Sequence, residues 1–180
     1  NYPVFEEELC KMEIKYLFGI VPEKKYFLNN TDINPSRSPF IKERIKIIYN
    51  EESLEEIVQN ILKEKLSYED FKISFIKLED TDISYKERLN SIRKLGLVIA
   101  GESEMHNPKV NRALTKVNNR WIFGEYQRND YKWHIHDEKP HNYSNSLGIR
   151  VARALVNIAI GQDVDKKIVD PGCGVGTVVI

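Results

Sequence analysis

The chain has 180 residues, no formal net charge, 41% hydrophobic residues and 30% charged residues. This balance excludes the weakly hydrophobic, highly charged class of disordered chains, and no apolar run approaches the roughly 18 residues that a membrane-spanning helix needs. The chain starts without a signal-peptide pattern and Cys10 and Cys173 are too few for a disulfide framework, so we expect a soluble cytoplasmic protein.

The first fifty residues predict one helix followed by two strands. Apolar residues recur at three- and four-residue spacings over residues 5–18, which predicts a helix that ends at Gly19. The buried face of this helix would consist of Phe5, Leu9, Met12, Tyr16 and Leu17. Residues 25–29 and 40–49 are rich in Ile, Phe and Tyr and flank a turn-prone segment, which predicts strand, loop and strand.

Two further helices are predicted from their starting signals. Ser53 and Glu56 have the spacing of a capping box, and an apolar stripe follows them to about residue 65. Ser84 and Glu87 repeat this spacing before a second stripe that ends by Gly101. Both segments are therefore expected to be helices with one buried side.

Between and after these helices the pattern changes to strands. Residues 71–76 alternate between apolar and polar side chains, and residues 112–117 and 121–126 flank an Asn118-Asn119 turn, which predicts a hairpin. Helices mixed with hairpins, without repeated strand–helix units, indicate an α+β fold for residues 1–130.

The segment after the hairpin is predicted to be a linker, residues 131–142, followed by a helix over residues 147–160. The apolar stripe of this helix would consist of Leu147, Val151, Leu155 and Ile158. His134, His136 and His141 lie close together in the linker, but no cysteine or carboxylate pattern completes a tetrahedral ligand set, so no metal site is predicted.

Basic and aromatic side chains are concentrated around the linker. Residues 1–104 carry 16 Lys and Arg against 20 Asp and Glu, whereas residues 105–140 carry 7 against 4. The alternating aromatic and cationic residues are Tyr126, Arg128, Tyr131, Lys132 and Trp133. Such a pattern is typical of a surface that stacks on RNA bases and contacts phosphates, and packing between domains explains it equally well.

The last segment, residues 166–180, predicts a short buried strand, an acid, a glycine-rich turn and the start of an apolar helix. Its glycines, Gly172, Gly174 and Gly176, would let backbone amides approach a ligand, and some of them would need positive φ. Their spacing departs from the dinucleotide fingerprint, and the lysine of a phosphate loop is missing. Asp170 would repel a pyrophosphate but suits the cationic amino group or sulfonium of S-adenosylmethionine.

These residues carry a resemblance to a known family. The sequence Asp170-Pro-Gly-Cys-Gly-Val-Gly-Thr177 resembles the Asp-Pro-x-Cys-Gly-x-Gly-Thr motif of class I RNA methyltransferases, and most closely that of enzymes that methylate the exocyclic N2 amine of guanosine in tRNA. Upstream, the family's THUMP-type region is similar to four short stretches that begin at Tyr85, Ile92, Asn107 and Trp121. Residues 141–159 resemble the helix that precedes the family's cofactor motif. Gly172 departs from the aromatic residue or Met that is usual at its position.

The resemblance implies a domain order and a cofactor. Residues 1–70 would form a ferredoxin-like region, 71–130 a THUMP-like RNA-binding region, and 143–180 the start of a truncated, Rossmann-like methyltransferase domain. S-adenosyl-L-methionine would be bound by Asp170, Pro171, Gly172, Gly174, Gly176, Thr177, Ser144, Asn145 and Ser146. The partner would be RNA, and specifically tRNA, with no membrane and no obligate protein partner.

RNA contacts are expected at cations of the hairpin, the helix before it and the linker. They are Arg93, Lys94, Lys109, Arg112, Lys116, Arg120, Arg128 and Lys132. Arg93 and Lys94 would equally suit a solvated helix face. The family's catalytic segment would follow Ile180, so we expect this stretch alone to be inactive and to bind the cofactor weakly. Two alternatives remain open: an amino-methylase of DNA adenine N6 or cytosine N4, and a non-catalytic RNA-binding module.

Overall fold

The computed structural model describes residues 6–79, 81–137, 146–174 and 176–178. The chain folds into two compact units. The central unit is Arg44–Gln127, and the flanking unit combines Asn1–Glu43 with Arg128–Ile180. The boundary predicted between residues 70 and 71 therefore falls inside the central unit, whose fold uses residues from both sides of it.

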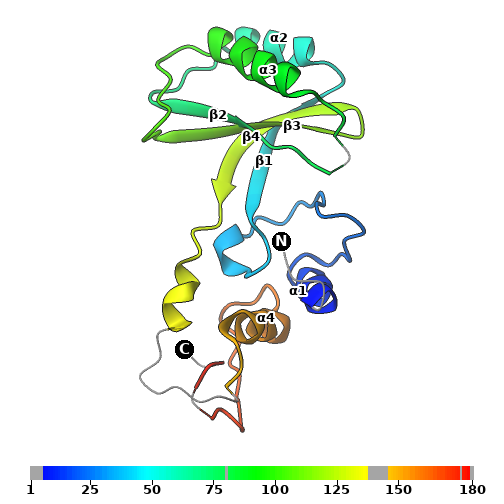
Figure 1. Ribbon diagram of the computed structural model, residues 1–180, viewed down its shortest axis with the longest axis vertical. Helices are drawn as coiled ribbons and strands as arrows, with labels where there is room; N and C mark the ends of the chain where they lie inside the picture. Colours follow the sequence, from blue (N-terminus) through cyan, green and yellow to red (C-terminus); the bar gives the residue numbers. More distant parts are fainter. Residues whose placement is uncertain (1–5, 80, 138–145, 175, 179–180) are drawn as a thin grey trace. The chain divides into compact units, whose positions relative to one another are not determined.

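The central unit is built on a four-stranded mixed sheet with the strand order β1-β4-β3-β2. The strands are β1 (Glu43–Glu51), β2 (Phe71–Phe75), β3 (Val110–Val117) and β4 (Arg120–Arg128). β2 pairs with β3 in parallel, whereas β3 pairs with β4 in antiparallel. Helices α2 (Leu54–Glu64) and α3 (Tyr85–Val98) connect the strands and lie together over the sheet (Figure 1). This mixed sheet with its helices confirms the predicted α+β class.

Local sequence signals account for the ends of these elements. Both predicted capping boxes are present: the hydroxyl of Ser53 accepts a hydrogen bond from the N–H of Glu56 at 3.2 Å, and Ser84 accepts one from Glu87 at 3.2 Å. The hairpin turn is confirmed as well, since Asn118 and Asn119 have φ of 47° and 64°, the left-handed pair that matches the twist of the flanking strands.

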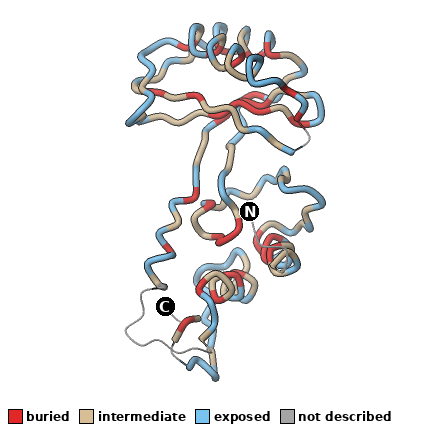
Figure 2. Tube along the Cα trace, viewed as in Figure 1, coloured by how far each residue is buried: buried red, intermediate tan, exposed pale blue. Residues whose placement is uncertain are grey.

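The core of the central unit lies between the sheet and the two helices. Figure 2 shows buried positions along the strands and on α2 and α3. The members are Tyr49, Leu54, Ile57, Ile61, Phe71, Ile73, Leu95, Ile99, Leu114 and Phe123. Fully burying one such side chain stabilises the fold by roughly 1.5–3 kcal/mol, so this cluster is the main source of stability in the unit.

Gly101 follows α3 at a point where the backbone is crowded. Its φ is 115°, and a Cβ at this position would lie 1.9 Å from the carbonyl oxygen of Tyr68. Only glycine fits here because any side chain would meet backbone rather than a movable group.

The flanking unit contains α1 (Glu7–Phe18), η2 (Pro35–Arg37), η3 (Lys132–Asp137) and α4 (Ile149–Ile160). α1 packs against α4, and their shared apolar core consists of Cys10, Ile14, Phe40 and Ala154. Gly19 ends α1 with φ of 74°, as predicted.

The predicted buried faces of α1 and α4 are only partly correct. Leu17 is buried and Leu9 packs on the core, as predicted, Val151 and Ile158 are half-buried, and Phe5 lies outside the described residues. α1 buries Cys10, Glu13, Ile14 and Leu17, while Met12 is 51% exposed and Tyr16 is 52% exposed. α4 buries Ile149, Ala152, Ala154 and Asn157, while Leu147 and Leu155 are exposed. Each helix turns a polar residue inward, Glu13 or Asn157, and a pattern that counts only apolar residues misses such a face.

Two predicted strands are absent. Residues 25–29 form bends and irregular chain, and residues 166–170, predicted as the buried first strand of a Rossmann-like domain, are also irregular, with Val169 88% exposed. A strand needs a neighbour for its backbone groups, and the four described strands all belong to the sheet of β1 to β4. Residues 176–178 form a turn rather than the predicted helix start.

No helix within the described ranges is long and apolar enough to span a membrane.

Candidate functional site

The predicted cofactor residues at the end of the chain form a glycine turn, which we define as the described residues between Asp170 and Thr177. The Asp170 carboxylate accepts a hydrogen bond from the N–H of Gly172 at 3.0 Å. Gly174 has φ of 52° and Gly176 has φ of 79°, so the prediction of positive φ is confirmed at two glycines. Pro171, Gly172 and Gly174 are exposed, and Thr177 is buried.

The backbone of the glycine turn near Asp170 is accessible to a ligand. A Cβ on Gly172 or Gly174 would meet nothing closer than 3.9 Å, so these positions have free space on their Cα atoms. Asp170 uses one oxygen for the turn itself, which leaves the second available to a cationic ligand group. The described part of the turn therefore presents a carboxylate oxygen and unobstructed backbone to a ligand.

The second predicted part of the cofactor site is only partly visible. Ser144 and Asn145 lie outside the described residues, as does His141. Ser146 is half-buried just before α4, and no hydrogen bond joins it to Asp170. Within the described ranges, no group of three His, Cys, Asp or Glu side chains is placed to hold a metal ion.

The cations predicted to contact RNA in the central unit are largely engaged within the fold. Lys94 pairs with Glu55, Lys109 pairs with Asp70 at 2.6 Å, and Arg120 lies 3.4 Å from Glu52. These pairs are exposed, and surface ion pairs contribute only about 0–1 kcal/mol, so their cations can exchange a carboxylate for a phosphate at low cost.

The remaining cations of this set differ in exposure. The guanidinium of Arg112 lies over the ring of Tyr68 at 4.2 Å, and the ammonium of Lys116 lies 5.6 Å from the centre of the Trp121 ring. Both residues are half-buried, which is less exposure than a residue that contacts RNA would need. Arg93 is exposed on α3. Contact with aromatic neighbours, Tyr68 in the loop before β2 and Trp121 on the paired strand, explains the burial.

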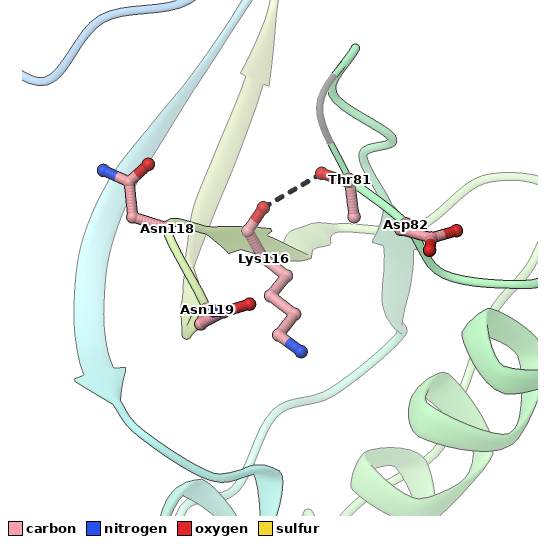
Figure 3. A pocket seen from close by; sticks show the side chains of 5 residues that line it. All are labelled: Thr81, Asp82, Lys116, Asn118 and Asn119. Carbon is pink, nitrogen blue, oxygen red and sulfur yellow. Dashed lines mark hydrogen bonds between the residues drawn. The ribbon is translucent and has the colours of Figure 1, made fainter.

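A small polar cavity of about 180 Å³ lies beside the hairpin turn (Figure 3). It is lined by Thr81, Asp82, Lys116, Asn118 and Asn119. The Thr81 hydroxyl donates to the carbonyl oxygen of Lys116 at 3.0 Å, which fixes the loop before α3 against β3. The space holds only a few water molecules, and the bonds across it are structural.

The flanking unit contains a buried polar network that sequence reasoning missed. Glu13 is 0% exposed, and its two carboxylate oxygens accept hydrogen bonds from the Ser38 hydroxyl at 2.6 Å and from the Asn157 amide at 2.5 Å. Burial raises the pKa of Glu13 to about 7, although the two hydrogen bonds and the charges of Arg153 and Arg37 act in the opposite direction. The donors come from distant parts of the sequence, so no local sequence motif predicts the network.

Two arginines extend this network toward the surface. Arg153 donates from Nε to the carbonyl oxygen of Arg37 at 2.9 Å and from Nη2 to that of Ser36 at 3.0 Å. Arg37 donates from Nε to the Asn157 side chain at 3.2 Å and from Nη2 to the carbonyl oxygen of Gly161. Neutral oxygens thus hold both guanidiniums in place.

The arginines border a polar cavity of the flanking unit, with a volume of about 520 Å³. We name it the arginine cavity. It is lined by Asn34, Ser36, Arg37, Asp130, Lys132, Trp133, Ile135, His136 and Arg153. Of the predicted RNA-binding residues, the arginine cavity includes Lys132, which is 80% exposed at its side chain and lies 3.7 Å from Asp130. Arg128 is exposed at the end of β4.

Aromatic rings gather beside the arginine cavity. Trp133 and His134 stack with ring centres 3.8 Å apart, and Tyr131 lies 6.2 Å from His134. Trp133 is buried, while His134 is exposed. The predicted alternation of aromatic and cationic residues therefore places Trp133 in the core of the unit and leaves His134 and Lys132 on the surface.

Comparison with known proteins gives limited similarity. No protein-family model matches the chain, and no curated protein matches it. The crystal structure of PH1313 from Pyrococcus horikoshii Ot3 is similar with a TM-score of 0.43 and 16% sequence identity, over 72% of this chain and 52% of that chain. A crystal structure of a 4-thiouridine synthetase–RNA complex with bound ATP gives a TM-score of 0.38 and 13% identity, over 68% of this chain and 36% of that chain.

The chain therefore spans about half the length of PH1313 and about a third of the synthetase. Similarity at this level assigns neither a family nor a function to the chain.

Proposed function

We propose that this chain is the substrate-binding part of an S-adenosylmethionine-dependent RNA methyltransferase with a THUMP-type region, acting on the N2 amine of a guanosine in tRNA. One observation carries the proposal: the Asp-Pro-Gly-Cys-Gly-Val-Gly-Thr sequence resembles the family's cofactor motif, and in its described part Gly174 and Gly176 have positive φ.

In this function the described residues bind and position rather than react. The second oxygen of Asp170 would hold a cationic group of the cofactor, and Gly172 and Gly174 would let the backbone approach it. S-adenosylmethionine supplies an activated methyl group, and the protein's contribution is to place the target amine in line with it.

RNA binding is supported by cations that can exchange partners. Lys94, Lys109 and Arg120 carry exposed ion pairs of low strength, Arg93 and Arg128 are exposed, and His134 offers a ring for base stacking. Exposed cations of this kind contact the phosphate backbone of RNA, and an exposed ring stacks on an unpaired base.

The proposal is tested by deleting the gene in its host and measuring modified nucleosides of tRNA and DNA by mass spectrometry. Loss of N2-methylguanosine from tRNA, restored by the wild-type gene, is expected. Loss of a methylated amine from DNA would favour a DNA amino-methylase. Unchanged nucleosides, together with tRNA binding by the chain, would leave a non-catalytic RNA-binding module.

A point variant tests whether the methyltransferase activity depends on the glycine turn. Asp170→Asn removes the charge but keeps an oxygen for the N–H of Gly172, so we expect complementation to fall by about tenfold or more, the effect of losing one charge-assisted hydrogen bond. Asp163→Asn is the matched control because the Asp163 carboxylate accepts the same kind of bond, from the N–H of Asp165 at 3.1 Å. Equal activity of the two variants would remove Asp170 from the cofactor site.

A further inference from the structure

The arginine cavity contains more positive charge than its own side chains neutralise. Arg37, Lys132 and Arg153 line it against a single carboxylate, Asp130. Hydrogen bonding from the N–H of Lys132 lowers the pKa of Asp130, so this carboxylate stays ionised, and it lies 3.7 Å from the Lys132 ammonium. Asp130 also attracts the charge of Arg153, and the buried carboxyl of Glu13 attracts both guanidiniums, but neither arginine forms an ion pair with a described carboxylate.

The guanidiniums are held ready by neutral groups. Nε and Nη2 of Arg153 donate to two carbonyl oxygens, and Nε and Nη2 of Arg37 donate to an amide oxygen and a carbonyl oxygen. Nη1 of each makes no hydrogen bond to any described residue. A guanidinium that is fixed through two of its nitrogens loses little freedom when the third binds an anion, and its planar donors suit phosphate.

The other polar atoms of the wall are also mainly donors. The Ser36 hydroxyl is already used within the wall, since its oxygen accepts a bond from the N–H of Asp130 at 3.0 Å and the hydroxyl bonds the Asp130 carboxylate. The Asn34 oxygen accepts from the N–H of Ser36, which leaves its amide hydrogens. The indole N–H of Trp133 is buried without a partner among the described residues. Such a set matches an acceptor-rich anion and disfavours a metal ion or an amine.

We propose that the arginine cavity binds a phosphate group, held by the guanidiniums of Arg37 and Arg153. Its volume of about 520 Å³ exceeds what a phosphate fills, and it falls in the range typical of small-ligand sites. The remaining space therefore suits the attached nucleoside. RNA as the source of the phosphate rests on the proposed function, and a free nucleotide is the other source of the same chemistry.

The first test is the salt dependence of tRNA binding, measured by fluorescence anisotropy of labelled bulk tRNA with the 180-residue chain. Arg153→Gln should weaken binding about tenfold and reduce the slope of log K against log salt by about 0.7–0.9, the value for one lost phosphate contact. Lys15→Gln is the matched control, since Lys15 is an exposed cation of the same unit on α1. It should leave the slope unchanged.

A second variant keeps the test decisive if Arg153→Gln fails to fold. Asp130→Asn removes the one carboxylate among the described residues of the cavity wall and retains an oxygen for the N–H of Lys132. It should tighten tRNA binding severalfold, whereas Asp163→Asn, which removes an exposed carboxylate elsewhere in the unit, should not.

An experiment with inorganic phosphate distinguishes RNA from a free nucleotide as the source of the bound phosphate. At constant ionic strength, replacing chloride by phosphate should raise the melting temperature of the wild type and not that of Arg153→Gln. A phosphate effect without tRNA binding would keep the phosphate site and reject both RNA as its source and the proposed function. Binding of tRNA with slopes and affinities that neither cavity variant changes would overturn the inference and leave the proposed function intact.

Discussion

The buried carboxyl of Glu13 predicts that the flanking unit loses stability as the pH rises. The pKa of this group is raised from an ordinary 4.5 to about 7, chiefly by burial. The folded state therefore holds a proton that the unfolded chain releases, so the free energy of unfolding falls between these two pH values and is constant above them. At 1.36 kcal/mol per pH unit, the full loss is about 3 kcal/mol.

The measurement compares the wild type with Glu13→Gln, which cannot ionise. Urea unfolding at pH values between 4.5 and 8.5, followed by tryptophan fluorescence, gives the free energy of unfolding for each protein. Trp121→Phe in both proteins leaves Trp133 as the single tryptophan, so the signal reports the flanking unit alone. The difference between the two curves removes the contribution of every other titrating group.

We expect the wild type to lose about 3 kcal/mol more than the variant between pH 4.5 and pH 8. A constant energetic effect of the substitution, such as an altered hydrogen bond to Ser38, would shift the variant's curve without changing its slope. Parallel curves would mean that the two donors facing Glu13 keep its pKa near the ordinary value. That result would refute the argument that burial dominates.

Three further predictions concern single positions. Gly101→Ala should destabilise the central unit by about 2–4 kcal/mol, because its Cβ would overlap a backbone carbonyl at a φ of 115°. Gly96→Ala, at an open helical position, should stabilise the unit by about 0.5–1 kcal/mol. Ser84→Ala should cost about 1 kcal/mol through loss of its capping box, again measured by urea unfolding. A thiol reagent should modify Cys173 in the native protein and Cys10 only after unfolding, since Cys173 is exposed and burial raises the pKa of Cys10 to about 12.

Each of these has a clear contrary result. Equal stability of the two glycine variants would mean that the backbone near Gly101 relaxes freely. No effect of Ser84→Ala would mean that water replaces the cap without loss. Rapid labelling of both thiols in the native state would mean that α1 separates readily from α4.

Predictions from the sequence succeeded where short-range chemistry determines the structure. A capping box joins residues three apart, and the Asn118-Asn119 turn needs only two left-handed residues, so these features are encoded locally. The positive φ of Gly174 and Gly176 was predictable for the same reason. The strand over residues 25–29 failed because its formation depends on a partner strand that the local sequence cannot specify.

The arginine cavity was beyond sequence reasoning because its parts are distant in the chain. Arg37 ends η2, in a segment that the sequence predicts as turn-prone, Lys132 lies in the predicted linker, and Arg153 lies on α4. Each was a plausible surface residue by itself. The bonds that join Arg153 to the segment of Arg37 end on backbone carbonyls, whose positions no side-chain pattern reveals.

The discontinuity of the flanking unit imposes an order on folding during synthesis. The central unit is one continuous stretch, Arg44–Gln127, so it can fold as soon as it leaves the ribosome. α1 is made earlier but cannot finish folding then, because Glu13 needs Asn157, which is synthesised 144 residues later. The apolar face of α1 therefore stays exposed to solvent while the central unit folds. During this interval a chaperone that binds apolar segments would protect the chain most.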